Sequence, residues 1–359
     1  MVGAGVVGCA IAYELASRGV QVHVVDARGA GLGATRASAG MLAPYIEGHS
    51  AALLQLGICG LDEYDGFISR VAADAGAPIE YRRTGTLQVA RDAVEARQLE
   101  QQDRILTATG VPHSLVDGRE AAHLEPGLFS PVHAALLVPQ HGYVGVQSLL
   151  AALVDAAGRR GAVFSVEHVL EIAGGSPVRV RTADREIAGD AVVLAAGSWS
   201  GGIPLAGATA APVRPVRGQL LHLRLPAPPL SRVVWGTAAY LVPWQDGSVL
   251  VGATVEDVGF DERVTVAGVR RLLDDGEQIV PALGSAVFEG ARAGLRPATA
   301  DELPIVGPSS TMRGVYFATG HYRSGVLLAP LTAVLVAGLL TGGRERTELA
   351  LIRPDRFGL

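Results

Sequence analysis

MVGAGVVG opens the chain as residues 1–8, and Asp26 follows at the end of the alternating run 20–25. Gly3, Gly5 and Gly8 have the Gly-x-Gly-x-x-Gly spacing of a phosphate-binding turn between a strand and a helix. The first glycine permits the tight turn, the second lets backbone N–H groups approach a pyrophosphate, and the third lets the helix pack on the strand. An acidic residue about 20 positions further on accepts hydrogen bonds from a ribose. The stretch therefore predicts a site for a dinucleotide, either NAD or FAD.

The strand that should lead into this turn is short. Only Met1 and Val2 precede Gly3, whereas strands commonly have about five residues. We therefore expect a truncated first strand. The central parallel sheet would then lose ladder hydrogen bonds, which would weaken cofactor binding.

Composition limits the classes of protein that the chain can represent. Its 359 residues suffice for two domains, and 49 % apolar with 18 % charged residues allow a large core. A net charge of −5 argues against nucleic acid or an anionic membrane as a partner. The uncharged run 326–340 is shorter than the ~20 residues of a membrane span and contains Pro330, so it predicts a buried helix. Cys9 and Cys59 form no metal or redox motif, so we expect no metal and a reducing, cytoplasmic location.

Periodicity and turn residues predict helices and strands that alternate along the chain. The Asp-Gly pair 246–247 lies between two apolar runs, a pattern typical of a β-hairpin. The apolar run 190–197 ends in small residues, and ligands in parallel sheets collect at such carboxyl ends. The expected helices are 6–18, 51–75, 93–110, 144–161 and 326–340; the expected strands are 20–25, 83–90, 163–169, 190–197, 217–225, 240–244, 248–254 and 315–320, with a hairpin near 178–185.

Several separated segments also occur together in one known family. They are the glycine turn with Asp26, then 34–42, 192–197, 240–243, 294–297 and 320–330. In this order they resemble the D-amino-acid oxidase superfamily of FAD enzymes, and most of all its glycine oxidases of thiamine biosynthesis. The resemblance covers nearly the whole chain. It implies an α/β fold in which a Rossmann-like FAD-binding domain (1–50, 140–212 and 292–359) is interleaved with an α+β substrate-binding domain on an antiparallel sheet (51–139 and 213–291).

The resemblance implies a cofactor site assembled from segments at both ends of the chain. The final helix would aim its positive N-terminus at the flavin and stabilise the charge of the reduced ring. No cysteine follows Cys59, whereas related sarcosine oxidases attach flavin through a cysteine near the C-terminus, so FAD should be non-covalent. The residues that the resemblance assigns to FAD are Gly3, Gly5, Val6, Val7, Gly8, Asp26, Ala27, Ala34, Thr35, Ala39, Gly40, Met41, Val169, Gly197, His321, Tyr322, Arg323, Ser324, Gly325, Val326 and Leu327.

Three further side chains are implied for the substrate. Arg296 would hold an amino acid carboxylate, because a guanidinium matches a carboxylate in bidentate geometry. Tyr240 would donate a second hydrogen bond to that carboxylate, and Arg323 would lie on the flavin side. Each also has a structural interpretation: a surface arginine, an aromatic packed on a sheet, and a member of an ion pair. Val255 and Ala238 are expected near this pocket without fixing which small substrate fits.

The implied reaction is oxidative deamination of glycine and other small amines or D-amino acids. A hydride would pass from Cα to flavin N5, oxygen would be reduced to hydrogen peroxide, and the imine would feed thiazole synthesis. One alternative is a D-amino acid dehydrogenase that passes electrons to a quinone or another acceptor. Another is a catalytically silent flavin-binding protein. An NAD-dependent dehydrogenase is disfavoured by the late segment 315–340, and action on tRNA by the acidic net charge. The family also implies a homo-oligomer.

Overall fold

The start of the chain lies in the middle of a parallel sheet. In the computed structural model, which describes residues 1–47, 50–343 and 346–359, Val2 bridges β1 (His23–Asp26) on one side and β12 (Val192–Leu194) on the other. Four backbone hydrogen bonds of 2.7–2.9 Å hold residues 1–3 between these strands. The first strand is therefore as short as the sequence indicates, but it keeps ladder bonds to both neighbours, so the expected gap in the sheet does not occur.

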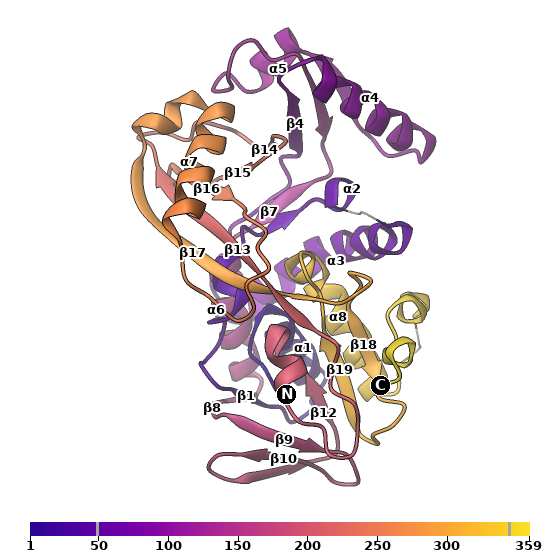
Figure 1. Cartoon of the computed structure of the whole chain (residues 1–359). Coiled ribbons are helices and arrows are strands. Elements are labelled where there is room, and N and C mark those ends of the chain that lie inside the picture. Colours follow the sequence, from indigo (N-terminus) through magenta and orange to yellow (C-terminus); the bar gives the residue numbers. More distant parts are fainter. Residues whose placement is uncertain (48–49, 344–345) are drawn as a thin grey trace.

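This first sheet has different layers on its two faces. Its order is β8 (Val163–Val166), β1, Val2, β12, β19 (Val315–Thr319) and β18 (Ile305–Pro308), all parallel except β18. Helices α1 (Val6–Ser17), α6 (Val146–Arg159) and α8 (Gly325–Leu340) cover one face. The other face packs on a small antiparallel sheet of β9 (Val169–Ala173), β10 (Val178–Thr182) and β11 (Glu186–Gly189). The two layers are visible in the lower half of Figure 1.

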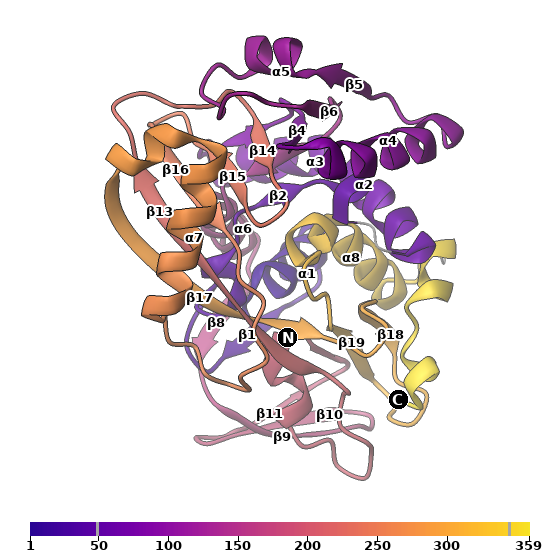
Figure 2. The ribbon, with the colours of Figure 1, turned by 45° about the horizontal axis from the view of Figure 1, so that its top comes forward.

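A second, eight-stranded sheet forms the rest of the molecule. Two long strands, β13 (Arg214–Arg224) and β17 (Val287–Ala298), pair along their length and run from this sheet down to the first one (Figures 1 and 2). The helix α7 (Val266–Ile279) buries Leu272 and Ile279 against the sheet. From β17 the order is β13, β16 (Ser248–Gly252), β15 (Tyr240–Pro243), β14 (Val233–Trp235), β4 (Thr86–Ala90), β6 (Ala134–Val138) and β5 (Ser114–Asp117).

Shorter elements join and cover the two sheets. A three-stranded sheet has the order β2 (Met41–Leu42), β7 (Gly142–Val144), β3 (Tyr81–Arg82). Its strands lie where the chain passes from one large sheet to the other: β2 and β3 between β1 and β4, and β7 between β6 and β8. The remaining helices are α2 (Pro44–Glu47), α3 (Ala51–Ala75), α4 (Ala93–Ala108) and α5 (Gly118–Leu124), and the 3-10 segments are η1 (Ala34–Ala37), η2 (Gly197–Gly202), η3 (Pro281–Ser285), η4 (Thr347–Leu351) and η5 (Pro354–Phe357).

Most elements lie where the sequence predicts them. The hairpin at the Asp-Gly pair is confirmed, with Tyr240 of β15 opposite Gly252 of β16. The strand expected over 163–169 is two strands, β8 and β9, which belong to different sheets. The helix α3 falls in the segment that we assign to the substrate domain, yet its buried face packs in the core formed by α1, α6 and α8. The division into domains stays a prediction, with α3 on the cofactor side of the molecule.

The proline in α8 is accommodated by a tyrosine of α3. Pro330 has no N–H and cannot bond to the carbonyl of Val326, four residues earlier in the helix. The Tyr64 hydroxyl donates to that carbonyl instead, at 2.6 Å, and Tyr64 is fully buried. This bond satisfies the carbonyl that the proline leaves without a helical partner and ties α3 to the start of α8.

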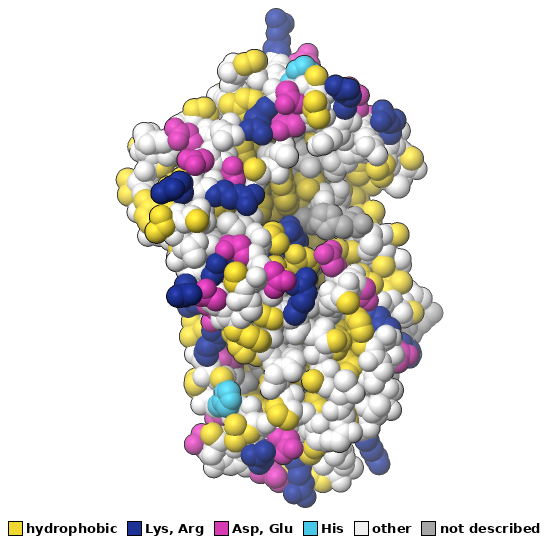
Figure 3. Space-filling view, in the orientation of Figure 1, with side chains coloured by type: hydrophobic (Ala, Val, Ile, Leu, Met, Phe, Trp, Pro, Cys, Tyr) yellow, Lys and Arg dark blue, Asp and Glu magenta, His cyan; other side chains and the backbone are white. Residues whose placement is uncertain are grey.

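The surface carries charges of both signs (Figure 3), in line with the small net charge of the chain. On the face shown in Figure 3, acidic and basic side chains are interspersed and no broad patch of one sign is seen. Within residues 1–47, 50–343 and 346–359, the helices are all too short or too polar to cross a membrane. The same described residues contain no group of three His, Cys, Asp or Glu side chains arranged to hold a metal ion.

Candidate active site

A cavity of about 870 Å³ extends from the glycine turn to the second sheet. Its volume lies near the upper end of the ~300–1,000 Å³ usual for ligand sites, as an extended dinucleotide plus a small substrate would require. At one end it is lined by Gly3, Gly5 and Asp26, and at the other by Tyr240 and Arg296. The structure thus brings the predicted cofactor and substrate residues into one continuous space.

The glycine-turn end presents backbone donors and a fixed carboxylate. Gly5, the N-cap of α1, and Val6 and Val7 of its first turn line the cavity, and a helix N-terminus favours an anion. The Thr35 hydroxyl accepts from the Val6 N–H at 3.0 Å, which ties η1 to this turn. Asp26 accepts from the backbone N–H groups of residues 4, 28 and 29 at 2.8–3.0 Å. These bonds hold the carboxylate at the carboxyl end of β1, where the sequence places a ribose.

Predicted cofactor residues divide into those that form the wall and those that support it. Gly8 does not line the cavity; a Cβ there would lie 2.1 Å from the carbonyl oxygen of Gly3, so this glycine permits the close packing that the motif predicts. Ser324 and Leu327 are buried behind the wall, at the start of α8. The predicted residues that line the cavity are Gly3, Gly5, Val6, Val7, Asp26, Ala27, Ala34, Thr35, Ala39, Gly40, Met41, Val169, Gly197, His321, Tyr322, Arg323, Gly325 and Val326.

His321 lies at the wall with its imidazole turned into the protein. Its Nε2 is 3.0 Å from the Thr332 hydroxyl of α8, and the side chain is 3 % exposed. Burial disfavours the charged ring and lowers the pKa of His321 to about 4. A neutral histidine therefore joins the loop before α8 to the helix.

Acid should destabilise the fold through this histidine. An unfolded histidine has a pKa of about 6.5, so between pH 6.5 and 4 the unfolded state binds more protons than the native state. We expect the free energy of unfolding to fall across this window, with a contribution from His321 of about 3 kcal/mol. Urea unfolding at pH 7.5, 6, 5 and 4 measures the effect. A His321→Gln variant should show a shallower decline, and an unchanged decline would contradict the assignment.

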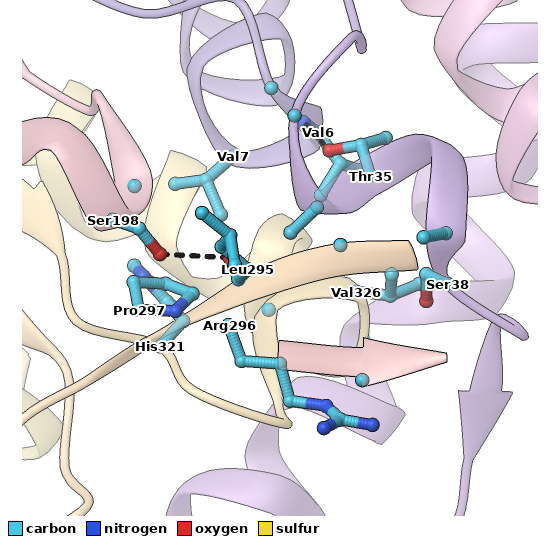
Figure 4. Close-up of a pocket in the computed structure, with 18 of the residues that line it drawn as sticks. Val6, Val7, Thr35, Ser38, Ser198, Leu295, Arg296, Pro297, His321 and Val326 are labelled. Atoms are coloured by element: carbon cyan, nitrogen blue, oxygen red, sulfur yellow. Dashed lines mark hydrogen bonds between the residues drawn. The ribbon is translucent and has the colours of Figure 1, made fainter. Parts of the chain in front are cut away.

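The substrate end is built on two glycines of adjacent strands. The Arg296 guanidinium lies over Gly218 of β13, where a Cβ would be 2.3 Å from its carbon, and the Tyr240 ring lies over Gly252 of β16 in the same manner. Arg296 Nη1 donates to the carbonyl of Thr254 at 3.0 Å. In Figure 4 the Arg296 side chain extends from β17 to the side opposite Leu295, whose carbonyl accepts from Ser198. Both predicted substrate residues are therefore held in place by neighbouring strands.

Arg323 lines the cavity, and its place beside the flavin stays a prediction. Its guanidinium is 5.4 Å from the ring of Tyr322, in the loop before α8. Tyr322 has a positive φ of 46° and its N–H donates to the carbonyl of Pro297. The loop is thus tied to the strand that carries Arg296, which brings both arginines to one cavity.

Filling the space beneath Arg296 should displace it. Gly218→Ala requires no special backbone angle, but its methyl group would overlap the guanidinium. We expect kcat/KM for the amine substrate to fall by about 10- to 100-fold, because small displacements of a positioning group have effects of this size. Gly158→Ala in α6, where a Cβ meets nothing within 4 Å, is the matched control. Equal kinetics of the two variants would contradict this geometry.

Several lining residues were missed by the sequence analysis. Arg28 and Trp199 belong to the wall, and each follows a strand end that had been recognised, so their position was a usable signal. Residues of the second sheet had no such signal, because their neighbours are set by long-range pairing. The further lining residues include Glu167, His168, Ser198, Trp235, Thr237, Ala253, Arg271 and Leu295, along with the anticipated Ala238 and Val255.

The turn, the helix N-terminus and the extended cavity define a dinucleotide-binding protein of the α/β class. The family model described as DAO, FAD dependent oxidoreductase, matches residues 1–339, and the chain belongs to this family. Its cofactor is FAD, and the cavity fits it: N–H donors stand at one end of an extended space and a carboxylate beside them. Neither of the two cysteines lines this space among the described residues, in keeping with the non-covalent binding that we expect.

Relatives and solved structures extend the similarity over the whole chain. The glycine oxidase of Geobacillus kaustophilus is 34 % identical over 98 % of this chain and 93 % of its own length. A crystal structure of glycine oxidase from that organism has a TM-score of 0.93 at 32 % identity and covers 98 % and 96 % of the two chains. Iminodiacetate oxidase from Chelativorans sp. BNC1 has a TM-score of 0.90 at 29 % identity and covers 98 % of each chain.

A longer relative matches over part of its length. The bifunctional protein ThiO/ThiG of Nostoc sp. is 35 % identical over 95 % of this chain. The match covers 52 % of the relative, so this chain spans about half of that protein. The chain is therefore similar both to a separate glycine oxidase and to about half of a longer, bifunctional protein.

Proposed function

We propose that this protein catalyses FAD-dependent oxidative deamination of glycine and other small amines or D-amino acids, with oxygen reduced to hydrogen peroxide. The observation that carries the proposal is the joint placement of Arg296 and Tyr240, on the second sheet, in the same cavity as the glycine turn. The similarity to glycine oxidases supports the choice of substrate. FAD, when bound, would supply the acceptor for the hydride that leaves the substrate Cα.

The residues of the substrate end favour an amino acid carboxylate. Arg296 would donate to both carboxylate oxygens and Tyr240 would donate through its hydroxyl, which fixes the orientation of Cα. Arg271, Arg296 and Arg323 all line the cavity, whereas its described carboxylates, Asp26 and Glu167, lie together at the ends of the paired strands β1 and β8. Positive charge near the substrate lowers the pKa of its amine and so favours the neutral amine that hydride loss requires.

Visible absorption of the purified holoenzyme under anaerobic conditions tests the proposal. Flavin bands that bleach with glycine and return with air, together with peroxide release, would support it. Bleaching only with D-alanine or D-proline would move the substrate to another D-amino acid. Reoxidation by a quinone but not by air would identify the dehydrogenase alternative. Flavin that no amine reduces would identify the silent flavin-binding alternative.

The proposal also covers the fate of the imine product, the cellular compartment and the oligomeric state. The similarity to bifunctional ThiO/ThiG proteins supports the delivery of the imine to thiamine thiazole synthesis. Both cysteines are free thiols, which agrees with the cytoplasm as the proposed compartment. We also propose a homo-oligomer, which light scattering coupled to gel filtration would test.

A further inference from the structure

The segment between β16 and α7, residues 253–265, connects the substrate end of the molecule to the edge of the cofactor cavity. We propose that this segment, named here the clasp, retains FAD by holding two residues of the cavity wall, Arg28 and Trp199. The inference depends on the FAD cavity and is independent of which amine is oxidised.

The base of the clasp is fixed on a buried arginine. Arg217 of β13 is 3 % exposed, and its guanidinium pairs with Glu256 at 2.5 Å and with Asp261 at 3.0 Å. Gln219, two residues further along β13, donates to the same Glu256 at 2.7 Å and accepts from the N–H of Thr265 at 2.8 Å. A buried charge is stable only when it is paired and hydrogen-bonded. These bonds therefore give the clasp one defined path across the protein.

The tip of the clasp contacts the loops that follow β1 and β12 of the first sheet. Glu262 pairs with Arg28 at 2.7 Å, and the ring of Phe260 lies 6.0 Å from that of Trp199. The Arg28 guanidinium also lies 4.1 Å above the Trp199 ring. Arg28 lies two residues after Asp26, the last residue of β1, and Trp199 lies in η2 after β12. Four side chains from three distant segments thus meet at the wall of the dinucleotide cavity.

This cluster is arranged to slow the departure of a bound dinucleotide. Arg28 and Trp199 line the cavity directly, and so does Gly33, which lies beside both of them: a Cβ there would be 3.4 Å from Arg28 and 3.5 Å from Trp199. For the wall to open, Arg28 or Trp199 must move, and each is held by a contact from the clasp. Since the ion pair is 35 % and 24 % exposed at its two side chains, salt should weaken it.

The rate of FAD release from the holoenzyme tests the clasp. It is measured as recovery of flavin fluorescence after dilution, for the native protein and for Glu262→Gln, Phe260→Ala and the double variant. We expect each single variant to release FAD about fivefold faster, and the double variant roughly 25-fold faster, since exposed ion pairs and aromatic contacts have effects of this size. Raising NaCl from about 0.05 to 1 M should accelerate release from the native protein and leave Glu262→Gln nearly unaffected.

Asp257→Asn is the matched control. Asp257 lies on the same segment, but its partner is Arg214, and the two side chains are 79 % and 61 % exposed. This variant should release FAD at the native rate. The proposal is overturned if Glu262→Gln and Phe260→Ala behave as the native protein, or if Asp257→Asn accelerates release as much as they do. Because the readout is cofactor release, the result is separate from any outcome with glycine.

Discussion

Replacing Arg296 by alanine is expected to lower kcat/KM for glycine by at least about a hundredfold. Its guanidinium is held between β17 and β13, with Nη1 bonded to the Thr254 carbonyl. A carboxylate that binds a partly buried, oriented guanidinium loses about 2–5 kcal/mol when the partner is removed. Steady-state peroxide production over a range of glycine concentrations measures the change. Both KM and kcat should be affected, because the bond also fixes the orientation of Cα.

Two companion variants separate this role from a structural one. Arg292→Ala removes a half-buried arginine of the same strand, whose guanidinium bonds to the carbonyl of Arg36. It should keep native kinetics. Arg296→Lys should recover only part of the activity, because an ammonium cannot reproduce the bidentate geometry. The FAD content and unfolding midpoint of Arg296→Ala should stay close to native. An unchanged kcat/KM in Arg296→Ala would remove this residue from the substrate site.

The parts of the fold that the sequence predicted are those determined locally. The glycine turn, the Asp-Gly hairpin between β15 and β16, and the helix α3 from Ala51 to Ala75 each follow from neighbouring residues. Whether the short first strand stays in the sheet was harder to predict from the sequence. Residues 1–3 are kept in the sheet by hydrogen bonds to positions 25, 193 and 195. A sequence window around residue 2 contains none of these partners.

The candidate site depends even more on residues that are distant in the sequence. Arg296 and Tyr240 were implied by resemblance, and both line the cavity, but their roles stay predictions. What positions them could not be anticipated: the two glycines beneath them lie on β13 and β16, and only the sheet register brings them there. The ion pair between Arg28 and Glu262 joins residues 234 positions apart. Such contacts depend on the completed fold, so local patterns do not reveal them.

Gly3→Ala is expected to lower the affinity of the apoprotein for FAD by at least about a hundredfold. Gly3 has a φ of 105°, and a Cβ there would lie 2.4 Å from the carbonyl oxygen of Ala195. That carbonyl belongs to the residue whose N–H donates to the carbonyl of Val2, so it cannot move without disturbing the ladder between the first strand and β12. The turn that presents the N-terminus of α1 to the dinucleotide would be displaced with it. Titration of the apoprotein with FAD, followed by flavin fluorescence, measures the affinity.

Gly19→Ala is the control that separates the steric overlap at Gly3 from the energetic cost of placing an alanine at a positive φ. Gly19 has a φ of 77°, but a Cβ there meets nothing within 4 Å. Its variant should lose about 1–2 kcal/mol of stability for the backbone angle alone and bind FAD with native affinity. Circular dichroism of both apoproteins shows whether each remains folded. If folded Gly3→Ala binds FAD as tightly as Gly19→Ala does, the glycine turn is not what holds the dinucleotide, and the site must rest on the cavity walls further along.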